Sequence, residues 1–524
     1  MRFGTQDRSR NAGWVWIVQA TKLRNALEGC ACSTIPLTQS DNFARREFHH
    51  RMQRTLARIL QYPPFTMSIL RTKVRGTSWS FGSLYEVMAK ANAPKSGDRL
   101  AGLSADTTQE RIAARQILSD LPLSLFLEQP AVPSERDEVT RILLDRIDPA
   151  AWSEIKGWSV GELREKILAA DGPTALRWGL GLPSEAIAAV AKLMSNLDLV
   201  SAAAKIPVDV RCRTRLGGAG ILSSRLQPNH PTDDLAGILA SLREGLSYAC
   251  GDAMVGINPA DDSVGAVRHT ADGVSEHVHD ILGVPTQVCV LAHATTQMEV
   301  LRQGGRLDLV FQSLAGTEDG CKSFGISGQL LSDARACQKE LRPELEQVMY
   351  FETGQGSELS AGAHHGIDQL TLESRCYGLA RAYDPFLVNT VVGFIGPEYL
   401  ADGREVARAG LEDHFMGKLH GLPMGVDVCY TNHMDADQND MENLAVLLTA
   451  AGCTFFMGVP LGDDVMLNYQ TTSFHDLASL RETLGRRTAP EFEAWMEKEG
   501  ILSNGRLTDL AGDPTLFESR RRYS

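Results

Sequence analysis

Six polar side chains lie at or just beyond the ends of short apolar runs, and their chemical types match the needs of one small ligand. They are Arg225, Gln227, Asn258, Gln312, Glu352 and Asp427. Carboxylates and amides accept hydrogen bonds from an ammonium group, and a guanidinium donates to a hydroxyl oxygen, with about 1.5–3 kcal/mol for each charge-assisted bond. The set predicts a pocket for a small amino alcohol, although polar residues also end strands for purely structural reasons.

Eight apolar runs must position these residues, and helical patterns separate the runs. We expect strands at 220–226, 253–259, 286–291, 307–314, 348–354, 386–395, 425–431 and 454–460. Eight strand-then-helix units between residues 220 and 485 match a (β/α)8 TIM barrel, which takes about 250 residues and carries its active site at the carboxyl ends of the strands. Periodicity alone leaves a doubly wound open sheet possible.

The chain is expected to divide into four parts around this α/β barrel. Residues 1–66 contain ten Lys or Arg against four Asp or Glu, which predicts a disordered basic leader, sequence upstream of a start at Met67, or an amphipathic address helix. Residues 67–215 predict a mostly helical domain, with helices over 107–127, 135–147 and 186–204 and a capping box at Ser159 and Glu162. The barrel takes 216–485, and a C-terminal tail takes 486–524.

Composition narrows the classes of partner and compartment. The net charge of −13 disfavours a nucleic-acid binder, which needs a basic face. Ten cysteines with no Cys-x-x-Cys pair favour reduced thiols in a cytoplasmic protein. Since no apolar run approaches the roughly 20 residues that span a bilayer, we expect no membrane segment.

From residue 67 to about residue 517 the sequence resembles the large, catalytic subunit of ethanolamine ammonia-lyase. The matching stretches are long and occur in the same order: RLQPN at 225–229, GDAMVGINP at 251–259, YFETGQGS at 350–357, NTVVGFIGPEYL at 389–400, RAGLEDHFMGKL at 408–419 and PLGDDVMLNYQTT at 460–472. Each stretch is far more specific than a three-residue motif. The similarity therefore covers most of the chain but not the basic segment 1–66.

This resemblance implies a radical enzyme that depends on adenosylcobalamin and converts ethanolamine to acetaldehyde and ammonia. In the implied reaction, hydrogen is removed from the hydroxyl-bearing carbon, the amino group migrates, and ammonia is lost. No Asp-x-His-x-x-Gly motif occurs, which favours base-on cobalamin. The family also implies a small partner subunit, a hetero-oligomer of both subunits, and a place in the cytoplasm or inside a bacterial microcompartment.

The resemblance also implies a role for each matching residue. Arg225, Asn258 and Glu352 are expected at the substrate hydroxyl, whereas Gln227, Glu352 and Asp427 are expected at the amino group. Arg225, Glu352 and Asp427 are thus the expected catalytic residues, and Leu226 is expected to line the site between its neighbours. The expected cofactor contacts are Pro259, Gln312, Ser360 and Met466, the cavity walls are Phe324, Phe394 and Met457, and no protein ligand to cobalt is expected.

Three other functions stay open on the residues alone. An NAD-dependent oxidoreductase would use Gly354 and Gly356 after a strand, but the third glycine comes only at Gly362. A non-enzymatic microcompartment component would leave the polar rim without a purpose. A metal-dependent hydrolase would use a sequence cluster that lacks the glycine and glutamate of a calcium loop: His414, His420, His433, Asp435 and Asp437.

Overall fold

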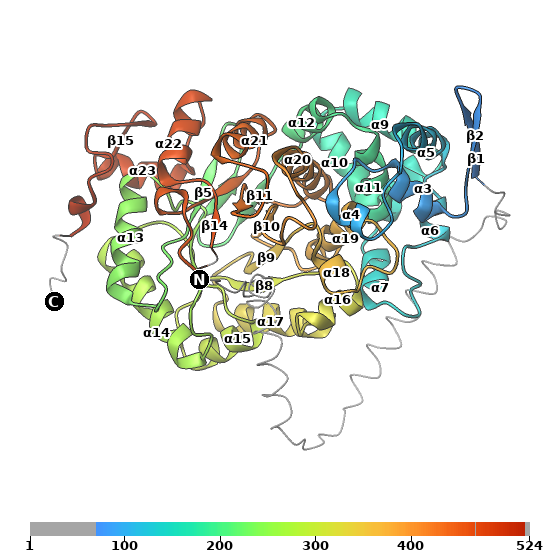
Figure 1. Cartoon of the computed structure of the whole chain (residues 1–524). Coiled ribbons are helices and arrows are strands. Elements are labelled where there is room, and N and C mark those ends of the chain that lie inside the picture. Colours follow the sequence, from blue (N-terminus) through green and yellow to red (C-terminus); the bar gives the residue numbers. More distant parts are fainter. Residues whose placement is uncertain (1–69, 467, 519–524) are drawn as a thin grey trace, which may run out of the picture.

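An eight-stranded parallel sheet, curled into a ring, forms the centre of the molecule (Figure 1). This computed structural model describes residues 70–466 and 468–518, so the expectations for the basic segment 1–66 lie outside the described residues. Each strand overlaps one predicted run, which confirms the α/β barrel. The strands are β5 (Ser223–Leu226), β6 (Met254–Ile257), β7 (Val288–Val290), β8 (Val310–Ser313), β9 (Met349–Thr353), β10 (Leu387–Val391), β11 (Met424–Asp427) and β13 (Phe455–Gly458).

The order of the strands shows that the sheet is nearly closed. It runs β7-β6-β5-β13-β11-β10-β9-β8, so the last strand of the barrel lies beside the first. At the remaining seam, the Asp308 amide donates to the Val288 carbonyl at 2.9 Å, and the Val288 amide donates to the Asp308 carboxylate at 3.0 Å. The doubly wound open sheet, which has two free edges, is therefore wrong.

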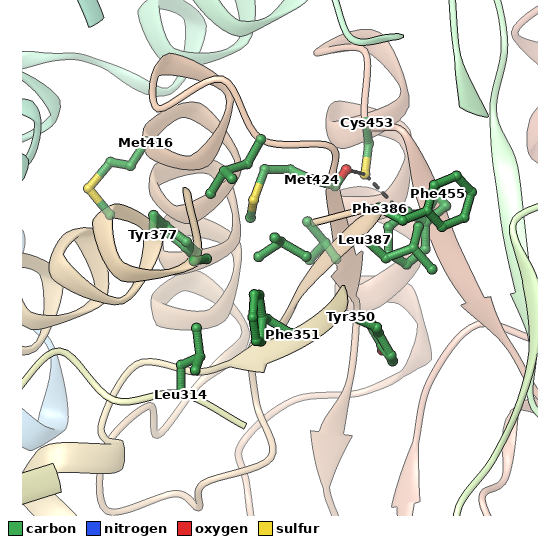
Figure 2. Packing of buried hydrophobic residues seen from close by; sticks show 14 of the residues in the cluster. Leu314, Tyr350, Phe351, Tyr377, Phe386, Leu387, Met416, Met424, Cys453 and Phe455 are labelled. Atoms are coloured by element: carbon green, nitrogen blue, oxygen red, sulfur yellow. Dashed lines mark hydrogen bonds between the residues drawn. The ribbon is translucent and has the colours of Figure 1, made fainter. Parts of the chain in front are cut away.

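Helices surround the ring, and an apolar layer separates them from the strands. Figure 2 shows Phe351, Met424, Tyr377 and Met416 in this layer. Parallel strands buried on both faces need such near-continuous apolar runs. The helices are α13 (Leu235–Ser247), α14 (Val264–Ser275), α15 (Ala294–Arg302), α16 (Glu318–Ser323), α17 (Gly328–Leu341), α18 (Ser357–Ser360), α19 (Gln369–Arg381), α20 (Gly403–Leu419), α21 (Gln438–Ala450) and α22 (Phe474–Thr483).

Before the barrel, the chain forms a hairpin and a layer of helices. The hairpin joins β1 (Leu70–Val74) and β2 (Thr77–Phe81) and was not predicted. Helix α11 packs on α19, and α12 packs on α20, at one side of the barrel (Figure 1). The helices are α3 (Leu84–Ala91), α4 (Ser96–Leu100), α5 (Thr108–Asp120), α6 (Leu125–Glu128), α7 (Glu138–Asp145), α8 (Pro149–Ile155), α9 (Val160–Ala169), α10 (Gly172–Gly181), α11 (Ser184–Leu193) and α12 (Asn196–Lys205).

Two predicted helices of this layer are each split into two. The run 107–127 breaks after α5 because Leu121 precedes a proline and adopts an extended backbone with ψ 134°. The run 186–204 breaks at Met194, and Ser195 starts α12 with a capping box. The capping box predicted at Ser159 is confirmed at the start of α9. Apolar periodicity does not reveal such breaks because both halves face the same core.

The C-terminal segment packs back on the barrel. It contains α23 (Pro490–Lys498), the strands β15 (Leu502–Ser503) and β16 (Arg506–Leu507), and a short turn of helix at Pro514–Phe517. The Trp495 indole donates to the Leu282 carbonyl at 3.2 Å and stacks on Phe517 with 5.8 Å between ring centroids. Among the described residues, no helix is both long and apolar enough to cross a membrane.

Candidate active site

A buried ion pair between two strands forms one end of the candidate site. Arg225 on β5 has no exposed surface, and its Nη1 lies 2.6 Å from Oε1 of Glu352 on β9. Gly256 on β6 leaves the space for this guanidinium, because a Cβ atom there would lie 2.6 Å from Arg225 Nε. Burial lowers the pKa of Arg225, but Tyr350 and Glu352 outweigh it and raise the pKa above its usual value. Arg225 therefore stays charged.

Two further residues hold the Glu352 carboxylate. Tyr350, two residues earlier on β9, donates its hydroxyl proton to Glu352 Oε1 and accepts from Arg225 Nη1 at 2.7 Å. Asn389 on β10 is the register partner of Glu352, and its Nδ2 lies 3.5 Å from the same oxygen. Three donors thus converge on Oε1, which leaves Oε2 as the oxygen of Glu352 that can receive a ligand.

Asp427, the last residue of β11, forms the other acidic group of the site. Its Oδ2 accepts from the Tyr469 hydroxyl at 2.9 Å, and its Oδ1 accepts from the Thr471 hydroxyl at 2.5 Å. Burial raises the pKa of Asp427 to about 7, although both hydrogen bonds lower it. Glu352 raises this pKa further and Arg225 lowers it. Asp427, Glu352 and Arg225 are therefore close enough to influence one another's charge.

Gln227, just after β5, is held by the segment that follows β13. Its Nε2 donates to the Asp464 carboxylate and lies 3.4 Å from the Tyr469 hydroxyl. Asn229 donates to the same Asp464 oxygen at 2.8 Å and accepts from the Asn258 amide at 2.8 Å. Because a carboxylate only accepts at neutral pH, the nitrogen of Gln227 must face Asp464 and its carbonyl must face elsewhere.

Several buried polar atoms of this group have no partner among the described residues. They are Nε and Nη2 of Arg225, Oε1 of Gln227 and Oδ1 of Asn389. A buried polar atom without a partner costs about 1–3 kcal/mol, so a group of them points to a ligand. The free atoms comprise donors on Arg225 and acceptors on the two amides, which together fit a molecule with one hydroxyl and one ammonium group.

Two of the expected site residues have side chains that point toward the surrounding helices. Gln312 is the register partner of Phe351, which faces the helices, and Gln312 Oε1 accepts from the Ala294 amide at the start of α15 at 3.0 Å. Gln312 is therefore not part of the polar cluster predicted from the strand ends. Leu226 packs against Gly245 of α13, so Leu226 can contribute only main-chain atoms to the site.

The remaining expected contacts lie on the strands and loops around this cluster. Met457 on β13 is buried and is the register partner of Arg225, and the Phe394 ring lies 5.5 Å from Tyr469. Ser360 ends α18 and donates to the Ser357 carbonyl at 2.8 Å. The half-buried residues Pro259, Phe324 and Met466 follow β6, α16 and β13, respectively.

Asn229 and five other residues of the cluster were not singled out from the sequence: Tyr350, Asn389, Asp464, Tyr469 and Thr471. The alternation of side chains along a strand would have found two of them, since Tyr350 lies two residues from Glu352 and Asn389 lies two residues before Val391, the register partner of Asp427. Asp464, Tyr469 and Thr471 come from the segment after β13, which contains the short strand β14 (Tyr469–Gln470). Nothing in their spacing indicates that they reach the barrel mouth.

Three residues of the rival metal site, Asp437, His414 and His420, lie on or at the ends of helices. Asp437 is the N-cap of α21 and accepts from the Asn439 and Asp440 amides at 2.8 and 3.2 Å. His414 and His420 are buried on or just after α20, and His420 lies 3.0 Å from the Ser184 hydroxyl. Among the residues described, no three or more His, Cys, Asp or Glu side chains are grouped so that they could hold a metal ion.

Comparisons with known proteins identify the family of the chain. The family model described as ethanolamine ammonia lyase large subunit matches residues 79–510. The ethanolamine ammonia-lyase large subunits of Escherichia coli K12 and Salmonella typhimurium LT2 are each 52% identical over 453 residues, which cover 86% of this chain and 99% of theirs. The resemblance noted in the sequence is thereby confirmed, and the chain belongs to the ethanolamine ammonia-lyase large-subunit family.

Proposed function

We propose that this chain is the catalytic subunit of an adenosylcobalamin-dependent lyase that converts ethanolamine to acetaldehyde and ammonia. The unpaired atoms of Arg225, Gln227 and Asn389 carry the proposal, because they match the two ends of a two-carbon amino alcohol. Family membership supports it. Adenosylcobalamin, when bound base-on, supplies the radical chemistry for removing hydrogen from the substrate, whereas the protein binds, orients and excludes water.

Each end of the substrate has its own set of residues in this proposal. Arg225 donates through Nη2 to the hydroxyl oxygen, and Asn258 and Glu352 complete that end. At the amine end, Gln227 Oε1, Glu352 and Asp427 accept from the ammonium group. The two carboxylates keep the nitrogen hydrogen-bonded while it moves between neighbouring carbons, so its charge is stabilised throughout by fixed groups.

The depth of the site supports radical chemistry. Arg225, Gln227 and Asp427 each have 0% exposed surface, so bulk water does not reach these three side chains, and such protection suits a reactive intermediate. Such exclusion also strengthens the electrostatic interactions of the charged groups with the substrate.

The rim of the barrel has the mixed character that a cobalamin requires. Leu461 and Val465, in the segment after β13, are 79% and 58% exposed and precede the expected contact Met466. Together with the polar side chains of Gln312 and Ser360, they can contact both the apolar edges and the amide groups of the cofactor. We further propose that a small subunit covers this face in a hetero-oligomer, in the cytoplasm or inside a microcompartment.

Co-expression with the neighbouring small subunit tests the proposal. Addition of adenosylcobalamin and ethanolamine should yield acetaldehyde and ammonia, together with a paramagnetic resonance signal that needs both additions. The variant Glu352→Gln should assemble with the small subunit but lose turnover, whereas a non-enzymatic component would show no turnover before substitution. Absence of acetaldehyde from an assembled, cobalamin-loaded complex would refute the proposed function.

A further inference from the structure

Two buried tyrosines each bridge two residues of the candidate site. Tyr350 accepts from Arg225 Nη1 at 2.7 Å and donates to Glu352. Tyr469, on the short strand β14 (Tyr469–Gln470), donates to Asp427 at 2.9 Å and lies 3.4 Å from Gln227 Nε2. The first tyrosine thus joins two residues of the hydroxyl end, and the second joins two residues of the amine end.

Hydrogen-bond chemistry fixes the direction of each bridge. A phenol has one proton to donate, and Arg225 cannot accept it, so the proton of Tyr350 must go to Glu352. The proton of Tyr469 likewise goes to the Asp427 carboxylate, and its lone pair receives the nitrogen of Gln227. With Nη1 of Arg225 and Nε2 of Gln227 occupied, Nε and Nη2 of Arg225 and Oε1 of Gln227 are the atoms of these two residues left for a ligand.

We infer that Tyr469 and Tyr350 are positioning residues that separately orient the amine end and the hydroxyl end of the substrate site, an inference that rests on the proposed function. Tyr469 holds the Asp427 carboxylate and turns the carbonyl of Gln227 toward the substrate ammonium group. Tyr350 holds Glu352 against Arg225 and thereby directs the remaining guanidinium nitrogens to the hydroxyl. Neither tyrosine needs to touch the substrate.

The groups around Asp427 influence its pKa, so the pH dependence of activity can separate the role of Tyr469 from that of Tyr350. The polar and ionisable groups that act on Asp427 come from several elements: Arg225 on β5, Glu352 on β9, Cys429 after β11, Tyr469 on β14, and Thr471 after β14. Donation from Tyr469 lowers the pKa of Asp427. Its removal therefore raises this pKa, and the acid limb of kcat/KM, which reports the free enzyme, moves to higher pH.

The test compares Tyr469→Phe with Tyr350→Phe in the complex with the small subunit. Loading with cyanocobalamin, which does not start turnover, allows calorimetric titration with ethylamine, which lacks the hydroxyl, and with ethylene glycol, which lacks the amine. Tyr469→Phe should weaken ethylamine binding about tenfold, equivalent to about 1.4 kcal/mol, and change ethylene glycol binding less than about twofold. Tyr350→Phe should weaken ethylene glycol binding more than ethylamine binding, although Glu352 also serves the amine end.

The adenosylcobalamin-loaded complexes provide a second measurement. The acid limb of kcat/KM for ethanolamine should move to higher pH in Tyr469→Phe and stay in place in Tyr350→Phe. Thr471→Val removes the other donor to Asp427 without changing the contacts of Gln227. It should therefore move the acid limb in the same direction. This variant replaces Tyr469→Phe in the test if Tyr469→Phe does not fold.

Three outcomes would overturn the inference. The first is equal weakening of both analogues by both tyrosine variants, and the second is full retention of both affinities. The third is an acid limb that moves in neither Tyr469→Phe nor Thr471→Val. A parent complex that binds neither analogue and makes no acetaldehyde would instead overturn the proposed function, and the inference with it.

Discussion

Arg375 on α19 and Arg225 on β5 are both fully buried. They differ in how many of their guanidinium nitrogens have hydrogen-bond partners. Arg375 donates from Nε to the Gly316 carbonyl at 2.7 Å and from its other nitrogens to Glu185, Asp137 and Thr140. Asp137 caps α7 and Glu185 lies on α11, so this cluster joins the N-terminal helices to the barrel. Arg225 uses only Nη1 and leaves Nε and Nη2 without partners among the described residues.

The difference separates a structural cluster from a binding site. Burial alone does not, because both side chains are 0% exposed. A buried guanidinium stabilises the fold only when its donors are matched, as they are at Arg375. Two guanidinium nitrogens of Arg225 have no acceptor among the described residues. Their burial lowers the stability of the fold, but it leaves both nitrogens able to bind a ligand. The comparison predicts opposite consequences for substitutions at the two positions.

The largest effect on activity should come from Arg225→Met. Loss of the donors to the substrate hydroxyl should lower kcat/KM by about a thousandfold, the upper end of the effect of removing one preorganised hydrogen-bond donor in other enzymes. Because Arg225 pairs with one partly exposed carboxylate and leaves Nε and Nη2 unmatched, the urea midpoint of unfolding should fall less than in Arg375→Met. Steady-state kinetics and urea titration of the same preparation check both statements. Unchanged kinetics would remove Arg225 from the site.

The largest effect on stability should come from Arg375→Met. This change leaves Asp137 and Glu185 buried without their cation, which costs about 3–5 kcal/mol of unfolding free energy. Arg404→Met is the matched control, since the Arg404 side chain is 94% exposed in its pair with Asp402 and should leave the urea midpoint in place. Equal midpoints for the two variants would contradict the structural role of Arg375.

A smaller, pH-dependent effect is expected for Asp427→Asn. The pKa of Asp427 is raised to about 7, above the roughly 3.9 of an exposed Asp. Such a group favours the fold while protonated, fully below about pH 4, and this contribution is lost as the pH rises through about 7. The Asn variant should therefore unfold at a higher temperature than the parent protein at pH 8, with less difference near pH 4.

Calorimetric scans across this pH range check the Asp427 prediction, and kcat/KM should fall in the same variant because Asn carries no charge for the ammonium group. The exposed neighbour Asp463 is the control. Asp463→Asn makes the same chemical change at an exposed position outside the site. A similar difference at every pH for Asp427→Asn would contradict the raised pKa.

The smallest effects are expected at Gln312, which faces the helices. Gln312→Leu removes the acceptor for the Ala294 amide and should cost about 1 kcal/mol of stability. Among the described residues, Nε2 of Gln312 has one hydrogen-bond partner, the Ser313 carbonyl at 3.4 Å, so this nitrogen can also donate to a cofactor. Gln312→Glu keeps the acceptor and removes the donor, so it should retain stability but weaken cobalamin binding about threefold. Equal cobalamin affinity in both variants and the parent would remove Gln312 from the cofactor contacts.

Local sequence patterns were sufficient to predict the barrel and three of its key residues. Eight apolar runs with helices between them gave the strands, and Arg225, Glu352 and Asp427 were found because each is a charge within or at the end of such a run. The direction of Gln312 was not predictable in the same way. Its strand is buried on both faces, so the alternation that normally tells the two faces apart is absent.

The sequence by itself determined the order of the strands and helices, the family, and the charged residues that end the barrel strands, because these depend on local periodicity and on contiguous motifs. Only the tertiary structure decided which buried polar atoms of the site have hydrogen-bond partners. Tyr469, Asp464 and Thr471 lie far along the chain from Gln227, and closure of the ring brings β13 beside β5 and the loop after β13 over the site. Hydrogen-bond matching is a property of that closed geometry, since each donor finds its acceptor on a different element.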